Sequence, residues 1–224
     1  MDRAGPAASI EGTEQMEGPT MGLRGRSALL IIDMQNDFLP GGALGISEGD
    51  VILPKINAYI RLFESRGLPI IATRDWHPPE TTHFKSRGGL WPVHCVQGTS
   101  GAEFHPDLAL PPGTIILSKG MGPEEDAYSA FQARDEQGRG LAELLRARGI
   151  SHLYICGLAL DYCVKFSGLD ASREGFGFTV LIDATRAVNL KIHDAERAIE
   201  ELVRAGAELT TFERLSRSPE EERE

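Results

Sequence analysis

The run SALLIID, residues 27–33, is the first of six short apolar stretches that decide the fold of this 224-residue chain. Its nearly unbroken aliphatic character is typical of a strand buried on both faces, as the strands of parallel sheets are. Five further stretches share this character: PIIATR at 69–74, TIILSK at 114–119, HLYICG at 152–157, FTVLID at 178–183 and residues 208–212. Together the six stretches predict a six-stranded sheet.

The segments between these strands have helical patterns. Apolar residues recur at helical spacing between 52 and 63 and between 192 and 203. Four helical patterns are followed by a glycine, which is a typical helix stop: Gly67, Gly149, Gly175 and Gly206. Strands that alternate with helices predict a mostly parallel sheet covered on both faces. We therefore expect a fold of the α/β class with three layers, α/β/α.

One domain is expected to occupy residues 26–215, because no linker composition or internal repeat divides this range. Residues 1–25 lack the apolar stretch and the basic cluster of a secretory signal, so we expect a disordered N-terminal tail. Residues 216–224 are rich in glutamate and predict an acidic C-terminal tail.

Charge and cysteine content restrict the partners of the chain. Lys and Arg number 23 against 33 Asp and Glu, a net charge of −10, and the isoelectric point is about 5.1. Nucleic acids and anionic membranes bind basic surfaces, so we expect neither as a partner. No apolar stretch approaches the roughly 18–20 residues that span a bilayer. The acidic charge favours a small-molecule ligand instead. Three cysteines, an odd number without a disulfide framework, favour the reducing cytoplasm.

Reactive side chains follow four of the predicted strands. Asp33, Asp75 and Lys119 stand at the ends of the first three, and Cys163 follows the fourth after a short turn. Ligands bind beyond the carboxyl ends of parallel strands, so these groups are expected at one edge of the sheet. Each residue taken alone has an ordinary structural explanation: a strand-end cap, a partly buried lysine or an inert thiol, as we expect for Cys95 and Cys156. Their convergence favours catalysis.

Each of these groups has an expected chemical role. A carboxylate at a dry pocket rim, Asp33, has a pKa raised toward that of a general base. Asp161 is expected to cap a helix whose first turn carries Cys163, where the helix dipole favours a thiolate. The charge of Lys119 would keep both the carboxylate and the thiolate ionised.

A second group of polar residues lies between positions 75 and 94. It contains the carboxylate of Asp75 and three of the six histidines, His77, His83 and His94. Isolated histidines are mostly surface or core residues, but an Asp-x-His pair near two further histidines favours a metal site. Oxygen and imidazole ligands suit zinc, manganese or ferrous iron. The other three histidines are expected to be structural: His105, His152 and His193.

Three aromatic residues lie near these groups in the sequence: Phe38, Trp91 and Tyr128. Aromatic residues are core residues by default. Together, these three would also suit the walls of a pocket for a flat, ring-shaped substrate, against which aromatic rings stack.

These residues resemble the nicotinamidase branch of the isochorismatase-like cysteine hydrolases. The resemblance covers residues 27–212 and is carried by five stretches in order: IIDMQNDFLPGGAL from Ile31, RDWHPP from Arg74, WPVHCVQGT from Trp91, SKGMGPEEDAYSAF from Ser118 and GLALDYCVKFSGLDA from Gly157. No single stretch is specific, but five in the family's order are. One departure is Leu160, where many relatives have threonine.

The resemblance implies a role for each matching residue. It implies a catalytic triad of Asp33, Lys119 and Cys163, and an oxyanion hole formed by the N–H groups of Ala159 and Cys163 after a cis peptide bond. It implies one divalent metal ion, zinc in first place with manganese or iron as alternatives, held by Asp75, His77 and His94. His83 matches a position that is a ligand only in some members. Phe38, Trp91 and Tyr128 match residues that line the substrate ring.

The resemblance further implies hydrolysis of nicotinamide to nicotinate and ammonia through a cysteine thioester, in NAD salvage. Members have several oligomeric states, so a homo-oligomer is compatible with the sequence.

Two alternatives stay open at this point. Another amide hydrolase of the superfamily could act on a pyrazinamide-like or carbamoyl group, although members with non-aromatic substrates generally lack Asp75, His77 and His94 together. A non-catalytic pyridine or metal sensor would not need Asp33, Lys119 and Cys163 together. Two other functions are disfavoured. Isochorismatase chemistry needs no cysteine nucleophile, and no G-x-G-x-x-G motif of a dinucleotide-binding oxidoreductase follows residue 33.

Overall fold

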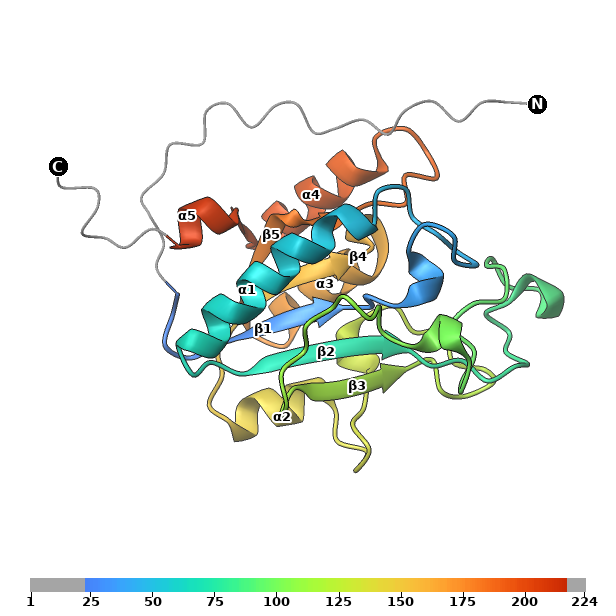
Figure 1. Cartoon of the computed structure of the whole chain (residues 1–224), viewed down its shortest axis with the longest axis horizontal. Helices are drawn as coiled ribbons and strands as arrows, with labels where there is room; N and C mark the ends of the chain where they lie inside the picture. Colours follow the sequence, from blue (N-terminus) through green and yellow to red (C-terminus); the bar gives the residue numbers. More distant parts are fainter. Residues whose placement is uncertain (1–22, 217–224) are drawn as a thin grey trace, which may run out of the picture.

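The computed structural model of the chain describes residues 23–216, so nearly all of the two expected tails, at 1–25 and 216–224, lies outside the described residues. A six-stranded sheet forms the centre of the molecule, with the strand order β3-β2-β1-β4-β5-β6 (Figure 1). All five neighbouring pairs are parallel. The strands are β1 (Ser27–Ile32), β2 (Ile70–Asp75), β3 (Ile115–Lys119), β4 (His152–Leu158), β5 (Gly177–Arg186) and β6 (Glu208–Thr210).

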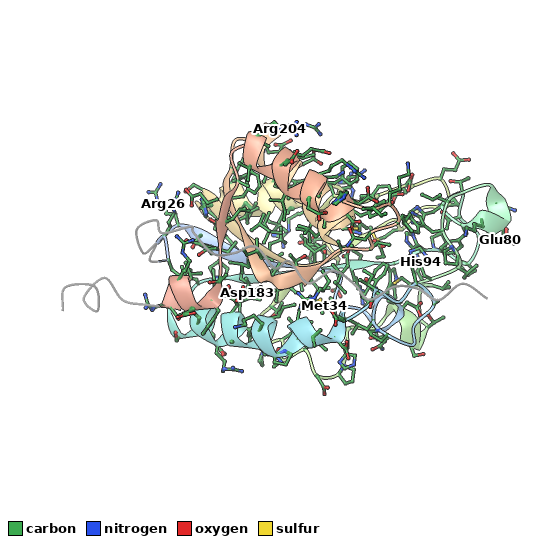
Figure 2. The ribbon with its side chains drawn as sticks, turned by 90° about the horizontal axis from the view of Figure 1, so that it is seen from above. Arg26, Met34, Glu80, His94, Asp183 and Arg204 are labelled. Atoms are coloured by element: carbon green, nitrogen blue, oxygen red, sulfur yellow. The ribbon has the colours of Figure 1, made fainter. Side chains whose placement is uncertain are left out.

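Helices cover both faces of this sheet, which confirms the expected α/β/α layers. The helices are α1 (Leu53–Ser65), α2 (Leu141–Ala147), α3 (Lys165–Arg173), α4 (Asp194–Arg204) and α5 (Phe212–Ser216). Seen from above, α1 and α5 lie on one side of the sheet and α4 on the other (Figure 2).

The alternation of side chains along β1 explains why both faces need a cover. Successive residues of a strand point to opposite faces. Leu29 and Ile31 therefore join a core with residues of α1 and α5, whereas Leu30 and Ile32 join a core with residues of α2, α3 and α4. Every residue of β1 is buried. The unbroken apolar run that predicted a doubly covered strand thus has its physical cause in the two cores.

The strand boundaries differ from the sequence prediction by one to three residues, and two of these differences have a clear cause. The expected strand at 208–212 ends at Thr210, and α5 begins at Phe212. The cause is a tertiary contact, because the N–H of Phe212 donates to Asp183 Oδ2 at 2.9 Å and its ring packs edge-on against Tyr59. The first strand ends one residue earlier than expected, because Asp33 has a positive φ of 50° and leaves the sheet.

The chain reverses its direction across the sheet between β1 and β4. The strands β1, β2 and β3 proceed toward one edge, and β4, β5 and β6 proceed toward the other. Such a switch point leaves a crevice beyond the carboxyl ends of the two central strands, and ligands bind there in open α/β sheets. Figure 2 shows His94 at one end of the molecule and Arg26, immediately before β1, at the other. No helix within residues 23–216 is long and apolar enough to cross a membrane.

Candidate active site

The side chains of Asp33, Asp75, Lys119 and Cys163 meet in the crevice beyond β1 and β4. Lys119 Nζ lies 2.8 Å from Asp33 Oδ2 and 3.6 Å from Cys163 Sγ, and it also donates to Asp75 Oδ1. All four residues are buried. Asp75 and Lys119 are register partners in adjacent parallel strands, so the sheet itself places these two side by side. The structure therefore brings together the groups that the sequence predicted to converge.

The two oxygens of Asp33 have different environments. Oδ1 accepts a hydrogen bond from the hydroxyl of Thr73 at 2.7 Å. Oδ2 is buried and lies 2.8 Å from the ammonium of Lys119, with which it forms an ion pair. Burial raises the pKa of Asp33, while Lys119 opposes this shift. A carboxyl group with one fixed oxygen, one available oxygen and a raised pKa suits a carrier of protons.

The thiol of Cys163 differs from its expected state. Burial raises the pKa of this thiol well above its usual value, and the carboxylates of Asp33 and Asp75 add to the shift, while Lys119 opposes it. Burial disfavours the charged form of Lys119 too, but the same two carboxylates raise the pKa of its ammonium. The prediction of a standing thiolate is therefore wrong for this arrangement of side chains. Cys163 keeps its proton until a base removes it.

The expected helix cap at Asp161 is also wrong. The two carboxylate oxygens of Asp161 accept the N–H groups of Val188 and Asn189, each at 2.9 Å. Cys163 lies in a π-helical turn, Leu160–Val164, that leads into α3 and has no side-chain cap. The carboxylate that the local sequence predicted as a helix cap instead binds two backbone N–H groups of the segment after β5. Asp161 thus ties the turn that carries the thiol to the loop after β5.

The turn before Cys163 has the backbone that the resemblance implies. The peptide bond between Leu158 and Ala159 is cis. Gly157, with a φ of 106°, precedes it, and a Cβ there would stand 2.1 Å from the carbonyl oxygen of Ile32. Glycine is therefore needed where β4 passes closest to β1. Ala159 and Cys163 line one pocket together.

Three imidazoles form a buried cluster beside Asp75. One ring nitrogen from each of His77, His83 and His94 lies within 4.8 Å of those of the other two. Asp75 Oδ2 lies 3.5 Å from His77 Nε2 and 3.9 Å from His94 Nε2. The predicted cluster thus forms, and it includes His83, whose position left its participation open. Burial lowers the pKa of His83 and lowers that of His94 to about 4, so both rings are neutral, as metal ligands must be.

The outward hydrogen bonds of these rings test whether a cation fits. Nδ1 of His77 faces the carbonyl oxygen of Gly120 at 3.1 Å, Nδ1 of His94 faces that of Pro92 at 2.8 Å, and Nδ1 of His83 faces a carboxylate oxygen of Asp126 at 2.5 Å. A proton on each Nδ1 leaves the lone pair of each Nε2 for a metal. His77 Nε2 is buried and has no hydrogen-bond partner within the described part of the chain. Three imidazoles and one carboxylate form a donor set that suits zinc, manganese or iron.

The predicted aromatic residues line the same pocket as Cys163. Phe38, Trp91 and Tyr128 all face it, together with His83 and His94. Nε1 of Trp91 donates to the hydroxyl of Tyr128 at 2.9 Å, which fixes the two rings relative to each other. A pocket with aromatic walls, a thiol and an imidazole cluster can hold a flat ring beside a nucleophile.

The remaining histidines and cysteines lie outside this pocket. Cys95 and Cys156 are buried and free, and burial raises the pKa of both thiols, as expected for inert core cysteines. His152 donates or accepts at Thr179, at the opposite end of the sheet. His105 and His193 do not belong to the imidazole cluster either.

Comparison with known proteins places this site in a family. The isochorismatase domain model matches residues 27–214. The chain belongs to the isochorismatase family. Its relatives include the nicotinamidase of Escherichia coli, which is 40% identical over 201 residues that cover 83% of this chain and 94% of the relative. The resemblance to the nicotinamidase branch is thereby confirmed.

Solved structures of similar proteins share the fold of this chain. The pyrazinamidase of Pyrococcus horikoshii in complex with zinc is 47% identical, with a TM-score of 0.77 over 84% of this chain and 99% of that chain. The PnC1 protein of L. infantum in complex with nicotinate is 36% identical, with a TM-score of 0.77 over 87% and 98%.

Three residues of this isochorismatase-family site have roles that the sequence analysis missed. The amide of Gln35 accepts from the N–H of Asp75 and donates to its carbonyl oxygen, each at 2.7 Å, which fixes the end of β2. Thr73 holds Asp33, as described above. Tyr162 lines the pocket, with its ring centroid 5.0 Å from that of Trp91. The available signal for Tyr162 was an aromatic residue directly before the candidate nucleophile.

Proposed function

We propose that this chain is a nicotinamidase, which hydrolyses nicotinamide to nicotinate and ammonia in NAD salvage. The observation that carries this proposal is the contact of Lys119 with Asp33 and Cys163 at a pocket with aromatic walls. A sensor of pyridines would need the walls but not this contact. An amidase for non-aromatic carbamoyl groups would need the contact but not the walls.

The pocket provides for binding of the substrate ring. The rings of Trp91 and Tyr128, coupled by their hydrogen bond, and the ring of Phe38 would hold the pyridine plane by stacking and edge contacts. Asp75, His77, His83 and His94 would hold one divalent ion, for which we propose zinc. When bound, this ion supplies a Lewis acid that can orient the pyridine nitrogen.

The acylation half of the reaction uses the protonation states of Asp33 and Cys163. Asp33 accepts the thiol proton, and Sγ attacks the carboxamide carbon, so that a C–S bond forms and the carbonyl electron pair moves to oxygen. The N–H groups of Ala159 and Cys163 stabilise the oxyanion, an effect for which loss of one donor typically lowers the rate about 100- to 1000-fold. Asp33 returns the proton to the amide nitrogen, the C–N bond breaks, and ammonia leaves.

Asp33 acts in the same order, first as a base and then as an acid, when the thioester is hydrolysed. Asp33, ionised again, accepts a proton from water as the water oxygen attacks the thioester carbon. The C–S bond breaks, the proton on Asp33 returns to the leaving sulfur, and the acid product loses the second proton of the water to solvent and is released as nicotinate. Lys119 balances the charge of Asp33 whenever that carboxyl group is ionised, since its ammonium lies between the two carboxylates.

The chemistry also indicates where the protein works. Three free cysteines, one of which is the proposed nucleophile, are best maintained in a reducing compartment, and we propose the cytoplasm.

Ammonia release from nicotinamide tests the proposal. Cys163→Ala is expected to lower kcat by more than about 1000-fold while far-UV circular dichroism stays unchanged. Cys156→Ala is the matched control, since it removes a buried thiol that does not line the pocket and should keep its activity. A chelator should abolish turnover and added zinc should restore it. Undiminished ammonia release by Cys163→Ala would contradict the thioester mechanism.

A further inference from the structure

The segment of residues 120–128, between β3 and the short helical turn Ala130–Gln132, orients two of the three clustered imidazoles. The carbonyl oxygen of Gly120 faces Nδ1 of His77, and the carboxylate of Asp126 faces Nδ1 of His83. The whole segment lies within the resemblance motif SKGMGPEEDAYSAF, yet Tyr128 is the only one of its side chains that the reaction described above uses.

Asp126 differs in kind from the other outward partners of the cluster. His77 and His94 face neutral carbonyl oxygens, whereas His83 faces a carboxylate, at 2.5 Å. A carboxylate behind an imidazole fixes which nitrogen carries the proton and makes the other nitrogen a stronger ligand. Asp126 also brings a second negative charge near a site whose inner carboxylate is Asp75.

The remaining contacts of His83 position its backbone and the faces of its ring. Its N–H donates to the hydroxyl of Thr81, and the ring stacks on that of His77 with centroids 4.7 Å apart and lies 5.7 Å from that of Tyr128. Stacking alone does not fix the rotation of the ring about its Cβ–Cγ bond, and a half-turn about that bond would put the carbon Cε1 where Nε2 stands. The hydrogen bond from Nδ1 to Asp126 opposes this half-turn and so keeps Nε2 pointing into the cluster.

We propose that Asp126 is a positioning residue that presents Nε2 of His83 to the bound metal and thereby sets the metal affinity of the site. The inference rests on the proposed metal-dependent function. Its physical basis is an unusual pairing: the Asp126 side chain is 60% exposed, while that of His83 is 4% exposed. A surface carboxylate thus reaches inward to a buried ligand, and its removal opens no cavity in either core.

The same segment connects the metal to the substrate walls. Tyr128, two residues after Asp126, accepts the hydrogen bond of Trp91. The carbonyl oxygen of Pro123 accepts the N–H of Thr82, one residue before His83, at 2.9 Å. Loss of the contact between Asp126 and His83 is therefore expected to affect metal binding first and the substrate wall second.

Zinc affinity of the purified protein tests this inference. Asp126→Ala is expected to raise the dissociation constant for Zn²⁺ about 10- to 100-fold, measured by competition with a chromophoric chelator. Asp126→Asn keeps a hydrogen-bond acceptor without the charge, so its dissociation constant for Zn²⁺ should lie between those of the unmodified protein and Asp126→Ala. Glu124→Ala is the matched control: it removes a carboxylate from the same segment, and Glu124 has no hydrogen bond or ion pair with residues 23–216. Its dissociation constant should change less than about twofold.

Two further readouts separate positioning from other effects. At saturating zinc the kcat of Asp126→Ala should return to within a few-fold of the unmodified protein, and its melting temperature in chelator should be unchanged. Unchanged zinc affinity in Asp126→Ala would overturn the inference, and so would an equal loss in Glu124→Ala, which would assign the effect to the general charge of the segment. Zinc binding is measured without nicotinamide, so this result is independent of whether nicotinamide is the substrate.

Discussion

Replacing Lys119 with methionine should destabilise the protein strongly, because Lys119 lies between two buried carboxylates. Methionine has similar length but no charge, so Asp33 and Asp75 would be left buried without their shared ammonium. Removal of one partner from a buried ion pair typically destabilises by about 3–5 kcal/mol. For a domain of this size each kcal/mol lowers the melting temperature by about 2–4 °C, so we expect a fall of about 6–20 °C.

Urea unfolding in chelator, followed by tryptophan fluorescence, measures this change. Lys85→Met is the control, since Lys85 is exposed and its free energy of unfolding should change by less than about 0.5 kcal/mol. The deficit of Lys119→Met should shrink as pH falls below 7, because carboxyl groups whose pKa is raised in the folded state gain stability by binding protons. Adding Asp33→Asn to Lys119→Met should recover part of the loss. A Lys119→Met protein within about 1 kcal/mol of the unmodified protein would refute this account of the buried charges.

Three further changes test other parts of the structure. Trp91→Phe removes the N–H that donates to Tyr128. Loss of this hydrogen bond should weaken binding by about 1 kcal/mol, which raises KM for nicotinamide about fivefold in steady-state assays with kcat nearly constant. Burial lowers the pKa of His152 to about 4, so the unfolded chain takes up a proton that the folded protein refuses, and stability is lost as pH falls from about 6.5 to 4. His152→Gln should flatten that slope in urea titrations at several pH values. A Cβ at Gly168 would stand 2.5 Å from Leu202 and 2.8 Å from Phe178, so Gly168→Ala should lower stability by about 1–3 kcal/mol without changing kcat.

The strands and the convergence of the reactive groups could be predicted because both depend on local sequence. A strand buried on two faces is mostly apolar, and the charged residue that ends it is easily seen, as with Lys119 at the end of TIILSK. Parallel pairing then places the strand ends together whatever the connections are. The metal cluster was likewise visible in its donor spacing.

The features that sequence analysis missed depend on contacts between distant segments. Asp161 has the local environment of a helix cap, but its oxygens are taken by backbone N–H groups 27 and 28 positions away. Phe212 continues a β-like pattern, but the contact with Asp183 starts a helix there. The protonation of Cys163 depends on complete burial and two carboxylates, which no local pattern records. Asp126 stands 43 positions from the imidazole that it orients.

The placement of the reactive groups at the ends of three strands and in the turn after a fourth makes catalysis a sensitive reporter of strand alignment. Asp33, Asp75, Lys119 and Cys163 meet only when β1, β2, β3 and the turn after β4 are all in register. A slip of one residue along any of these strands would displace its group by about 3.3 Å and turn it to the opposite face. A refolding chain can therefore regain its helices and its compactness while it remains inactive. The return of ammonia production then reports that the last of these strands has paired in the correct register.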